Sequence, residues 1–227
     1  MNQKHVHYFD WLRLISAIGV IYMHVASGPL RGSINLDWHV MNALTCFAFT
    51  AVPLFLMMSG YLILNSEKTA DISVLFRKRL PRLVIPLIGW TVVAILWRMI
   101  NGHNYSVSYF FSTLVKSLHT PAWVHLWYMY SLIVLYIISP FLYSALQSLS
   151  KKGHIMVFSI ICILCARTML RVLLPGSIKP FLQISILDNL DFLGGILPLF
   201  LLGYYLGNLN KRIPNGILIA GIITLLL

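Results

Sequence analysis

The sequence is poor in charged residues. Only 10% of its 227 residues are charged, whereas soluble domains carry about a quarter. Hydrophobic residues make up 59% of the chain and its mean hydropathy is +0.81, so a water-soluble fold would lack the polar side chains to cover its surface. The same apolar content excludes intrinsic disorder. The scarcity of charge therefore indicates an integral membrane protein.

Acidic residues and cysteines are also scarce. Six Asp and Glu stand against 17 Lys and Arg, which gives a formal net charge of +11. In a soluble protein this excess would suggest nucleic-acid binding. In a membrane protein, basic residues gather in cytoplasmic loops, and we expect no nucleic-acid partner. The three cysteines lie inside apolar runs, which predicts helix packing and no disulfide framework.

Several well-known catalytic motifs are missing. The chain has no Walker loop, no G-x-G-x-x-G and no H-E-x-x-H, and its eight histidines show no metal-ligand spacing. From these missing motifs we predict no metal and no permanently bound cofactor. The first apolar stretch also lacks the small-residue pattern of a cleavable signal peptide.

Six apolar stretches qualify as membrane spans, because a bilayer core of about 30 Å needs roughly 20 helical residues. They are residues 8–26, 43–64, 83–100, 126–146, 155–174 and 192–207. The fold class we predict is all-α, a polytopic transmembrane helix bundle. A seventh run, 217–227, has about half the required length. We expect residues 1–227 to be a single transmembrane domain truncated within its seventh span.

The basic residues predict a cytoplasmic N-terminus. With that orientation, ten Lys and Arg lie in inner segments and three in outer segments, as the positive-inside rule requires. In the long outer segment 101–125, apolar residues from Val107 to Leu118 recur at helical spacing. This pattern predicts an amphipathic helix on the outer membrane interface.

Three ionisable residues interrupt the first predicted span. Arg13 and His24 are eleven residues apart, about three turns plus 20°, so they share one face with a separation of about 16 Å along the axis. Asp10 is spaced to pair with Arg13. Histidine moves protons near neutral pH and can act as general base for a hydroxyl nucleophile. The alternative is a simple Asp10–Arg13 pair with a hydrated His24, and the spacing favours neither.

A basic run occupies residues 77–82. Its Arg79 and Arg82 can bind phosphate through paired hydrogen bonds. Ordinary positive-inside charge, or contact with lipid headgroups, is the default interpretation of the run. The run is therefore a candidate anion site at the predicted inner face.

Two further sets of residues are candidates for binding an acceptor. Arg167 and Arg171 lie four residues apart on one face of the fifth predicted span and could hold an anionic lipid-linked substrate, although Arg171 can also snorkel to the interface. Trp127 and Tyr128 begin the fourth predicted span. Anchoring in the interfacial aromatic belt is their default interpretation.

Ordered motifs along nearly the whole chain resemble the membrane acyltransferase-3 family. The matching segments are YFDWLR (8–13), VIYMH (20–24), VPLFLMMSGY (52–61), RLPR (79–82), HLWY (125–128) and ISP (138–140). The resemblance implies an enzyme of the bacterial inner membrane. Such enzymes move an acyl group, commonly acetyl from acetyl-CoA, to a hydroxyl of an extracytoplasmic glycan or its lipid-linked precursor. The bilayer, acyl-CoA and the glycan are the expected partners.

The resemblance also implies roles for individual residues. Arg13 and His24 correspond to the catalytic signature, and Arg79 and Arg82 to the motif that serves the cytosolic donor. We expect the pantetheine arm of the donor to pass between helices and to present its thioester near His24. Two alternatives remain: an exporter of surface polysaccharide or glycolipid, and a non-catalytic subunit of a glycan-assembly complex.

Overall fold

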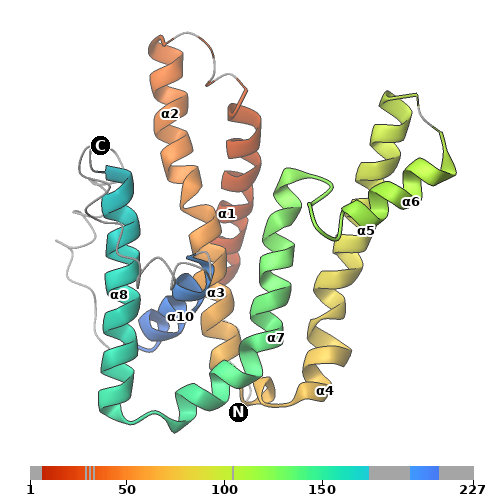
Figure 1. Ribbon diagram of the computed structural model, residues 1–227. Coiled ribbons are helices and arrows are strands. Elements are labelled where there is room, and N and C mark those ends of the chain that lie inside the picture. The colour runs from red at the N-terminus through yellow and green to blue at the C-terminus, as the bar shows by residue number, and fades with distance from the viewer. Residues whose placement is uncertain are drawn as a thin grey trace. The chain divides into compact units, whose positions relative to one another are not determined.

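The computed structural model describes residues 7–28, 30, 32, 34–103, 105–173 and 195–209. Within these residues the regular structure is entirely helical and contains no strand (Figure 1), so the all-α prediction is confirmed there. The chain divides into two compact units. Unit 1 comprises residues 1–62 and 152–227, and unit 2 comprises residues 63–151.

Unit 1 contains α1, α2, most of α3 and α8, and α10. Their bounds are His7–Ala26 for α1, Leu36–Phe49 for α2, Ala51–Leu64 for α3, Lys151–Leu173 for α8 and Ile196–Gly207 for α10. Helix α2 begins earlier than the predicted start at residue 43, because the Asn35 side chain accepts a hydrogen bond from the Trp38 backbone N–H at 2.8 Å and caps the helix. Helices α2 and α3 meet at Thr50 and together cover the second predicted span.

Small residues bring the helices of unit 1 close together. Helix α1 lies beside α2 (Figure 1). A Cβ atom built on Gly19 of α1 would lie 3.4 Å from the Cβ of Ala51, so small side chains on both sides set the spacing of α1 from α3. Nearer the start of α1, the rings of Phe9 and Tyr61 pack with centroids 5.4 Å apart. Helix α1 therefore packs along α3 through one line of contacts.

Helix α10 crosses α3 at a point where neither helix has room for a side chain. A Cβ atom on Gly60 would collide with the carbonyl group of Phe200, and one on Gly203 would collide with the backbone of Met57. Such close crossings through small residues are characteristic of membrane helices. One turn after Gly203, Gly207 lies directly against the ring of Tyr61.

Unit 2 contains η2, α4, η3, α5, α6, η4 and α7. Their bounds are Glu67–Thr69, Ile72–Val74, Leu75–Arg79, Pro81–Asn101, Val107–Lys116, Val124–Leu126 and Trp127–Ser148, in that order. The helical path before α5 starts earlier than the predicted span, because Asp71 caps α4 and η3 is a wider π-helical turn in which the Leu80 N–H donates to the Leu75 carbonyl at 2.9 Å. Buried Leu87, Ala94 and Leu126 belong to the core between α5 and α7.

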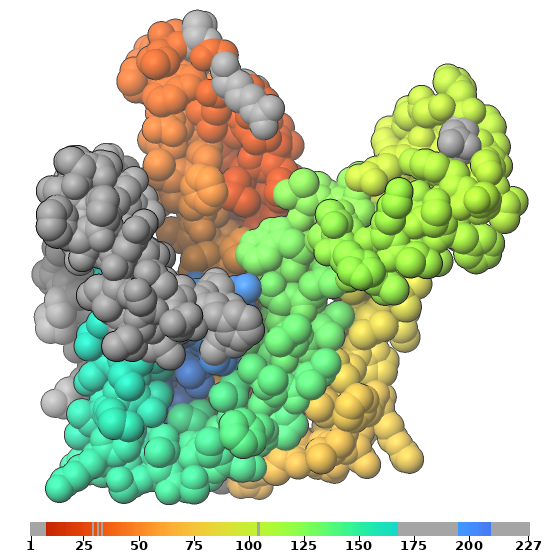
Figure 2. Space-filling view, in the orientation of Figure 1, coloured from red at the N-terminus to blue at the C-terminus, as the bar shows by residue number. Residues whose placement is uncertain are grey.

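The predicted amphipathic helix is present as α6. Its Val107, Phe111 and Val115 side chains are all exposed, and the space-filling view shows the surface of this part of unit 2 (Figure 2). The Tyr130 hydroxyl of α7 donates to the Ser117 carbonyl at 2.6 Å and fixes the end of α6. An exposed apolar stripe on a short fixed helix is typical of a helix lying in a membrane interface.

Four helical stretches in the described residues are long and apolar enough to cross a membrane. They are Tyr8–Ala26, Leu36–Leu64, Ile72–Asn101 and Val124–Ser148, which correspond to the first four predicted spans. Helix α8 covers most of the fifth predicted span, and the shorter α10 lies in the sixth. The run 217–227, and with it the predicted seventh span, lies outside the described residues.

Candidate functional site

The N-terminal end of α1 carries an ion pair. Nη1 of Arg13 donates to Oδ1 of Asp10 at 3.3 Å, and both side chains are 46% exposed. The contact agrees with the pairing predicted from their three-residue spacing. Asp10 lies in the first turn of α1, where the helix dipole stabilises a carboxylate. The carboxylate therefore holds the Arg13 guanidinium against the side of its own helix.

His24 occupies the last turn of the same helix and is half-buried. Its backbone carbonyl accepts a hydrogen bond from the Ser27 hydroxyl at 2.8 Å, which satisfies one of the carbonyls at the helix end. Because α1 is continuous from His7 to Ala26, Arg13 and His24 lie on one face about 16 Å apart along the axis. The structure places them on one stripe and keeps them out of mutual contact.

The polar stripe of Asp10, Arg13 and His24 follows the edge of the buried face of α1. Phe9 and Ser16 on the buried face are 8% and 2% exposed, whereas Trp11 and Ile18 on another side are 66% and 59% exposed. In a membrane-spanning helix, the exposed apolar side is suited to contact lipid. The three polar residues thus lie where a substrate can contact them beside a packed helix surface. We call these three residues the α1 stripe.

In unit 2, the first arginine of the R-L-P-R motif is a structural anchor. Nη1 of Arg79 donates to the Thr69 hydroxyl at 2.7 Å, and that hydroxyl donates in turn to the Ile63 carbonyl. Thr69 is buried and Arg79 is half-buried. Segments η2 and η3 both lie against α7. The guanidinium therefore connects two consecutive turns of the loop and fixes its path.

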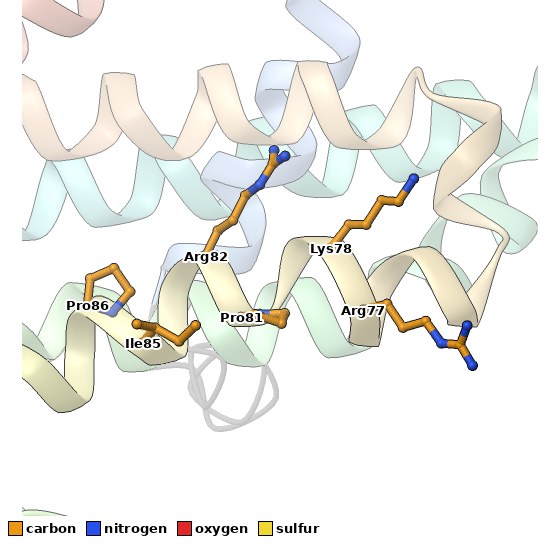
Figure 3. A pocket seen from close by; sticks show the side chains of 6 residues that line it. All are labelled: Arg77, Lys78, Pro81, Arg82, Ile85 and Pro86. Atoms are coloured by element: carbon orange, nitrogen blue, oxygen red, sulfur yellow. The ribbon is translucent and has the colours of Figure 1, made fainter.

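The second arginine of the motif is exposed. Arg82 lines a groove of about 690 Å³ together with Arg77, Lys78, Pro81, Ile85 and Pro86. Figure 3 shows the Lys78 and Arg82 side chains extending in the same direction one helical turn apart, while Arg77 extends away from them. Cationic groups on a rigid proline-containing turn can bind a polyanion such as a chain of phosphates. We call Arg77, Lys78 and Arg82 the basic turn.

The structure separates the two arginines that the sequence assigned to the donor. The sequence grouped Arg79 with Arg82, whereas the structure holds Arg79 against Thr69 and exposes Arg82. Arg77 and Lys78, which belong to the same basic run, line the groove together with Arg82. The run itself was the available signal. Helical spacing could not show which of its side chains share a side, because the π-helical turn changes the spacing.

The predicted acceptor residues fall in both units. Arg167 in α8 is only 5% exposed. Arg171 follows one turn later on the same helix, and its side chain lies outside the described residues. Trp127 is exposed and Tyr128 is half-buried at the start of α7, with ring centroids 6.2 Å apart. The roles of all four residues stay predictions.

Residues 6–227 match a protein family described as an acyltransferase domain. Comparison with curated proteins gives no match. Comparison with solved structures also gives none. Within the described residues, no group of three or more His, Cys, Asp or Glu side chains is arranged to hold a metal ion.

Proposed function

Because the chain belongs to the acyltransferase-3 family, and is therefore a multi-pass membrane acyltransferase, we propose that it transfers an acetyl group from acetyl-CoA to a hydroxyl of a surface polysaccharide or its lipid-linked precursor. Its motifs resemble those of the O-acetyltransferase that modifies enterobacterial common antigen, which supports a glycan acceptor. The proposed location is the bacterial inner membrane, with the N-terminus in the cytoplasm.

The observation that carries this proposal is the α1 stripe. We propose that the His24 imidazole accepts the proton of the acceptor hydroxyl while the hydroxyl oxygen attacks the thioester carbonyl. The carbon–sulfur bond then breaks, and the thiolate of CoA leaves and takes the proton back from the imidazolium. The products are the acetyl ester and CoA. A half-buried histidine in a helix that is long and apolar enough to cross a membrane supports this role.

The remaining residues of the stripe have a different task in this proposal. Arg13 lies about 16 Å from His24 along the helix, too far to contact the same reacting atoms. We assign Arg13 to holding the donor, and we assign Asp10 to orienting Arg13 through their 3.3 Å hydrogen bond. The pair is then a positioning device, and His24 is the proton acceptor.

The basic turn supplies the proposed binding site for the phosphates of CoA. Arg82, Arg77 and Lys78 are exposed and line one groove, so phosphate oxygens can reach them from solvent. Arg79 keeps the turn in place through Thr69. On the acceptor side, we propose that Arg167 and Arg171 bind an anionic lipid-linked sugar and that Trp127 and Tyr128 contact its glycan.

The direct test is a transfer assay with the purified protein in lipid nanodiscs. Acetyl-CoA labelled in its acetyl group is supplied with extracted lipid-linked glycans, and both labelled glycan and released CoA are measured. We expect label in the glycan with the wild type and labelling about 10²–10⁴-fold slower with His24→Ala. The matched control is His39→Ala, which removes an exposed histidine of α2 in the same unit.

Each contrary outcome has its own meaning. A wild-type protein that transfers no label to any glycan would refute the reaction class. A fully active His24→Ala protein would refute the assignment of the base. In sealed proteoliposomes, movement of glycan across the membrane without consumption of acetyl-CoA would favour an exporter.

A further inference from the structure

Ser16 has an unusual environment in α1. Its side chain is 2% exposed, and its hydroxyl is the one buried side-chain polar atom without a hydrogen-bond partner in the part of the chain that the structure describes. A buried polar group without a partner is costly, and more so in a membrane-spanning helix where no water reaches it. The position therefore calls for a reason other than packing.

Other helical serines hydrogen-bond their hydroxyls to carbonyls of their own helix. The hydroxyls of Ser131, Ser139 and Ser144 each donate to a carbonyl three or four residues earlier, at 3.2, 2.8 and 3.0 Å. This bond within the helix is the usual way to satisfy a serine in an apolar setting. Ser139 is the closest match, because it is fully buried in α7. Ser16 makes no such bond, so its hydroxyl keeps its donor for another partner.

The position of Ser16 around the helix shows what that partner can be. Ser16 is three residues from Arg13 and three from Gly19, so it lies about 60° from each around the axis. Gly19 marks the line of contact with Ala48 and Ala51, whereas Arg13 belongs to the α1 stripe. The hydroxyl therefore lies between the packed surface and the stripe. Along the axis it is about 4.5 Å beyond Arg13 and about 12 Å before His24.

We propose that Ser16 is a donor-binding residue whose hydroxyl donates a hydrogen bond to an amide carbonyl of the pantetheine arm of acyl-CoA. This inference rests on the proposed function. The arm is an apolar chain interrupted by two amides, and each amide carbonyl needs a hydrogen-bond donor when it leaves water. If the thioester lies at His24 and the arm follows the stripe, Ser16 is about 12 Å away along the axis. The part of the arm beside Ser16 is then an amide, and the thioester is out of its reach. Ser16 thus holds the arm and takes no part in the chemical step.

The proposal predicts an unusual pair of effects for one substitution. Ser16→Ala removes no internal hydrogen bond, so the melting temperature should stay the same or rise. Affinity for CoA should fall about 3- to 10-fold, the effect of losing one neutral hydrogen bond. Ser139→Ala should do the reverse, lowering the melting temperature and leaving CoA affinity unchanged. Ser16→Cys, a weaker hydrogen-bond donor of similar size, should have an intermediate affinity.

The test measures the dissociation constants of two probes by calorimetry, with the full chain in nanodiscs. The first probe is CoA. The second is 3′-phosphoadenosine 5′-diphosphate, which has the phosphates of CoA and lacks the arm. We expect Ser16→Ala to weaken binding of CoA alone and Arg82→Ala to weaken binding of both probes.

Three results would overturn the proposal: unchanged CoA binding by Ser16→Ala, equal weakening of both probes, and a fall in melting temperature as large as that of Ser139→Ala. A wild-type protein that binds neither probe would instead contradict the proposed function. The two failures are therefore distinguishable.

Discussion

The α1 stripe and the basic turn use arginine in opposite ways. Arg13 is held by a carboxylate one turn away on its own helix, so the charge of the pair is largely neutralised. Arg79 is held by the neutral hydroxyl of Thr69, so the guanidinium keeps its full charge beside the exposed Arg77, Lys78 and Arg82. The first arrangement fixes geometry with little net field. The second arrangement builds a positive field that attracts a polyanion from a distance.

The proposed roles predict that His24 and the basic turn affect different kinetic constants. A group that acts in the chemical step changes kcat, whereas a group that binds substrate and transition state equally changes KM. His24→Ala should therefore change kcat, whereas substitutions of the donor-binding groups Arg82, Arg13 and Asp10 should change KM.

The largest expected effect is that of His24→Ala. Loss of a general base lowers kcat by about 10²–10⁴-fold, while the KM for acetyl-CoA should stay within about twofold because the donor contacts remain. Steady-state kinetics of acetyl transfer measure both constants. His39→Ala is the control and should match the wild type. A His24→Ala protein with a raised KM and normal kcat would assign His24 to binding.

Arg82→Ala is expected to have the next largest effect. It should raise the KM for acetyl-CoA about tenfold with kcat nearly unchanged, because one charge-assisted contact to phosphate is lost. Arg82→Lys keeps the positive charge but lacks the planar guanidinium, so its KM should lie between those of the wild type and Arg82→Ala. Kinetics over a range of salt concentrations provide the check, since screening should raise the wild-type KM and narrow its difference from Arg82→Ala. A fall in kcat with an unchanged KM would contradict this prediction, because Arg82 would then act in the chemical step as His24 does.

Thr69→Val should affect stability more than binding. The substitution removes the hydroxyl that links the Arg79 guanidinium to the Ile63 carbonyl. The carbonyl keeps its bond from the Ser66 N–H at 3.2 Å, whereas the half-buried guanidinium loses its partner, and we expect a loss of about 1–3 kcal/mol in unfolding free energy. Thermal unfolding in detergent measures it. Thr45→Val is the matched control, because Thr45 makes one hydrogen bond, to the Met41 carbonyl at 2.7 Å. Equal losses in the two proteins would show that Arg79 adds nothing to the loop.

Asp10→Asn should have the smallest effect on stability. The Asp10 and Arg13 side chains are both 46% exposed, and ion pairs this exposed contribute about 0–1 kcal/mol to the unfolding free energy. The substitution keeps the shape and removes the charge, and a rise in the KM for acetyl-CoA is expected because Arg13 loses the carboxylate that positions it. A loss of stability larger than that of Thr69→Val would contradict this prediction, because the exposed Asp10–Arg13 pair would then stabilise the protein more than the buried Thr69 hydroxyl does.

Much of the fold could be predicted from the sequence, because membrane helices are defined by long apolar runs. The first four predicted spans coincide with described helices, and the helical spacing of 107–118 predicted α6. The starts of α2 and of the helical path into α5 were missed. They depend on caps at Asn35 and Asp71 outside the apolar runs, where hydropathy carries no signal.

The site divides in the same way. Asp10 and Arg13 are neighbours on one helix, so their spacing sufficed to predict their pairing. The contact of Arg79 with Thr69 joins residues that are ten apart across a non-helical turn, and no periodicity predicts such a contact. The unsatisfied hydroxyl of Ser16 also needs three-dimensional packing to be recognised, because in sequence it is one serine among many.

The crossing of α3 and α10 has a consequence for how this protein can vary. At Gly60 and Gly203, even a methyl group would meet the backbone of the opposite helix. Glycine is therefore the one residue that fits at these two positions, even if the acceptor specificity changes. Random mutagenesis followed by selection for activity should return glycine at both codons, even where the surrounding apolar positions exchange freely.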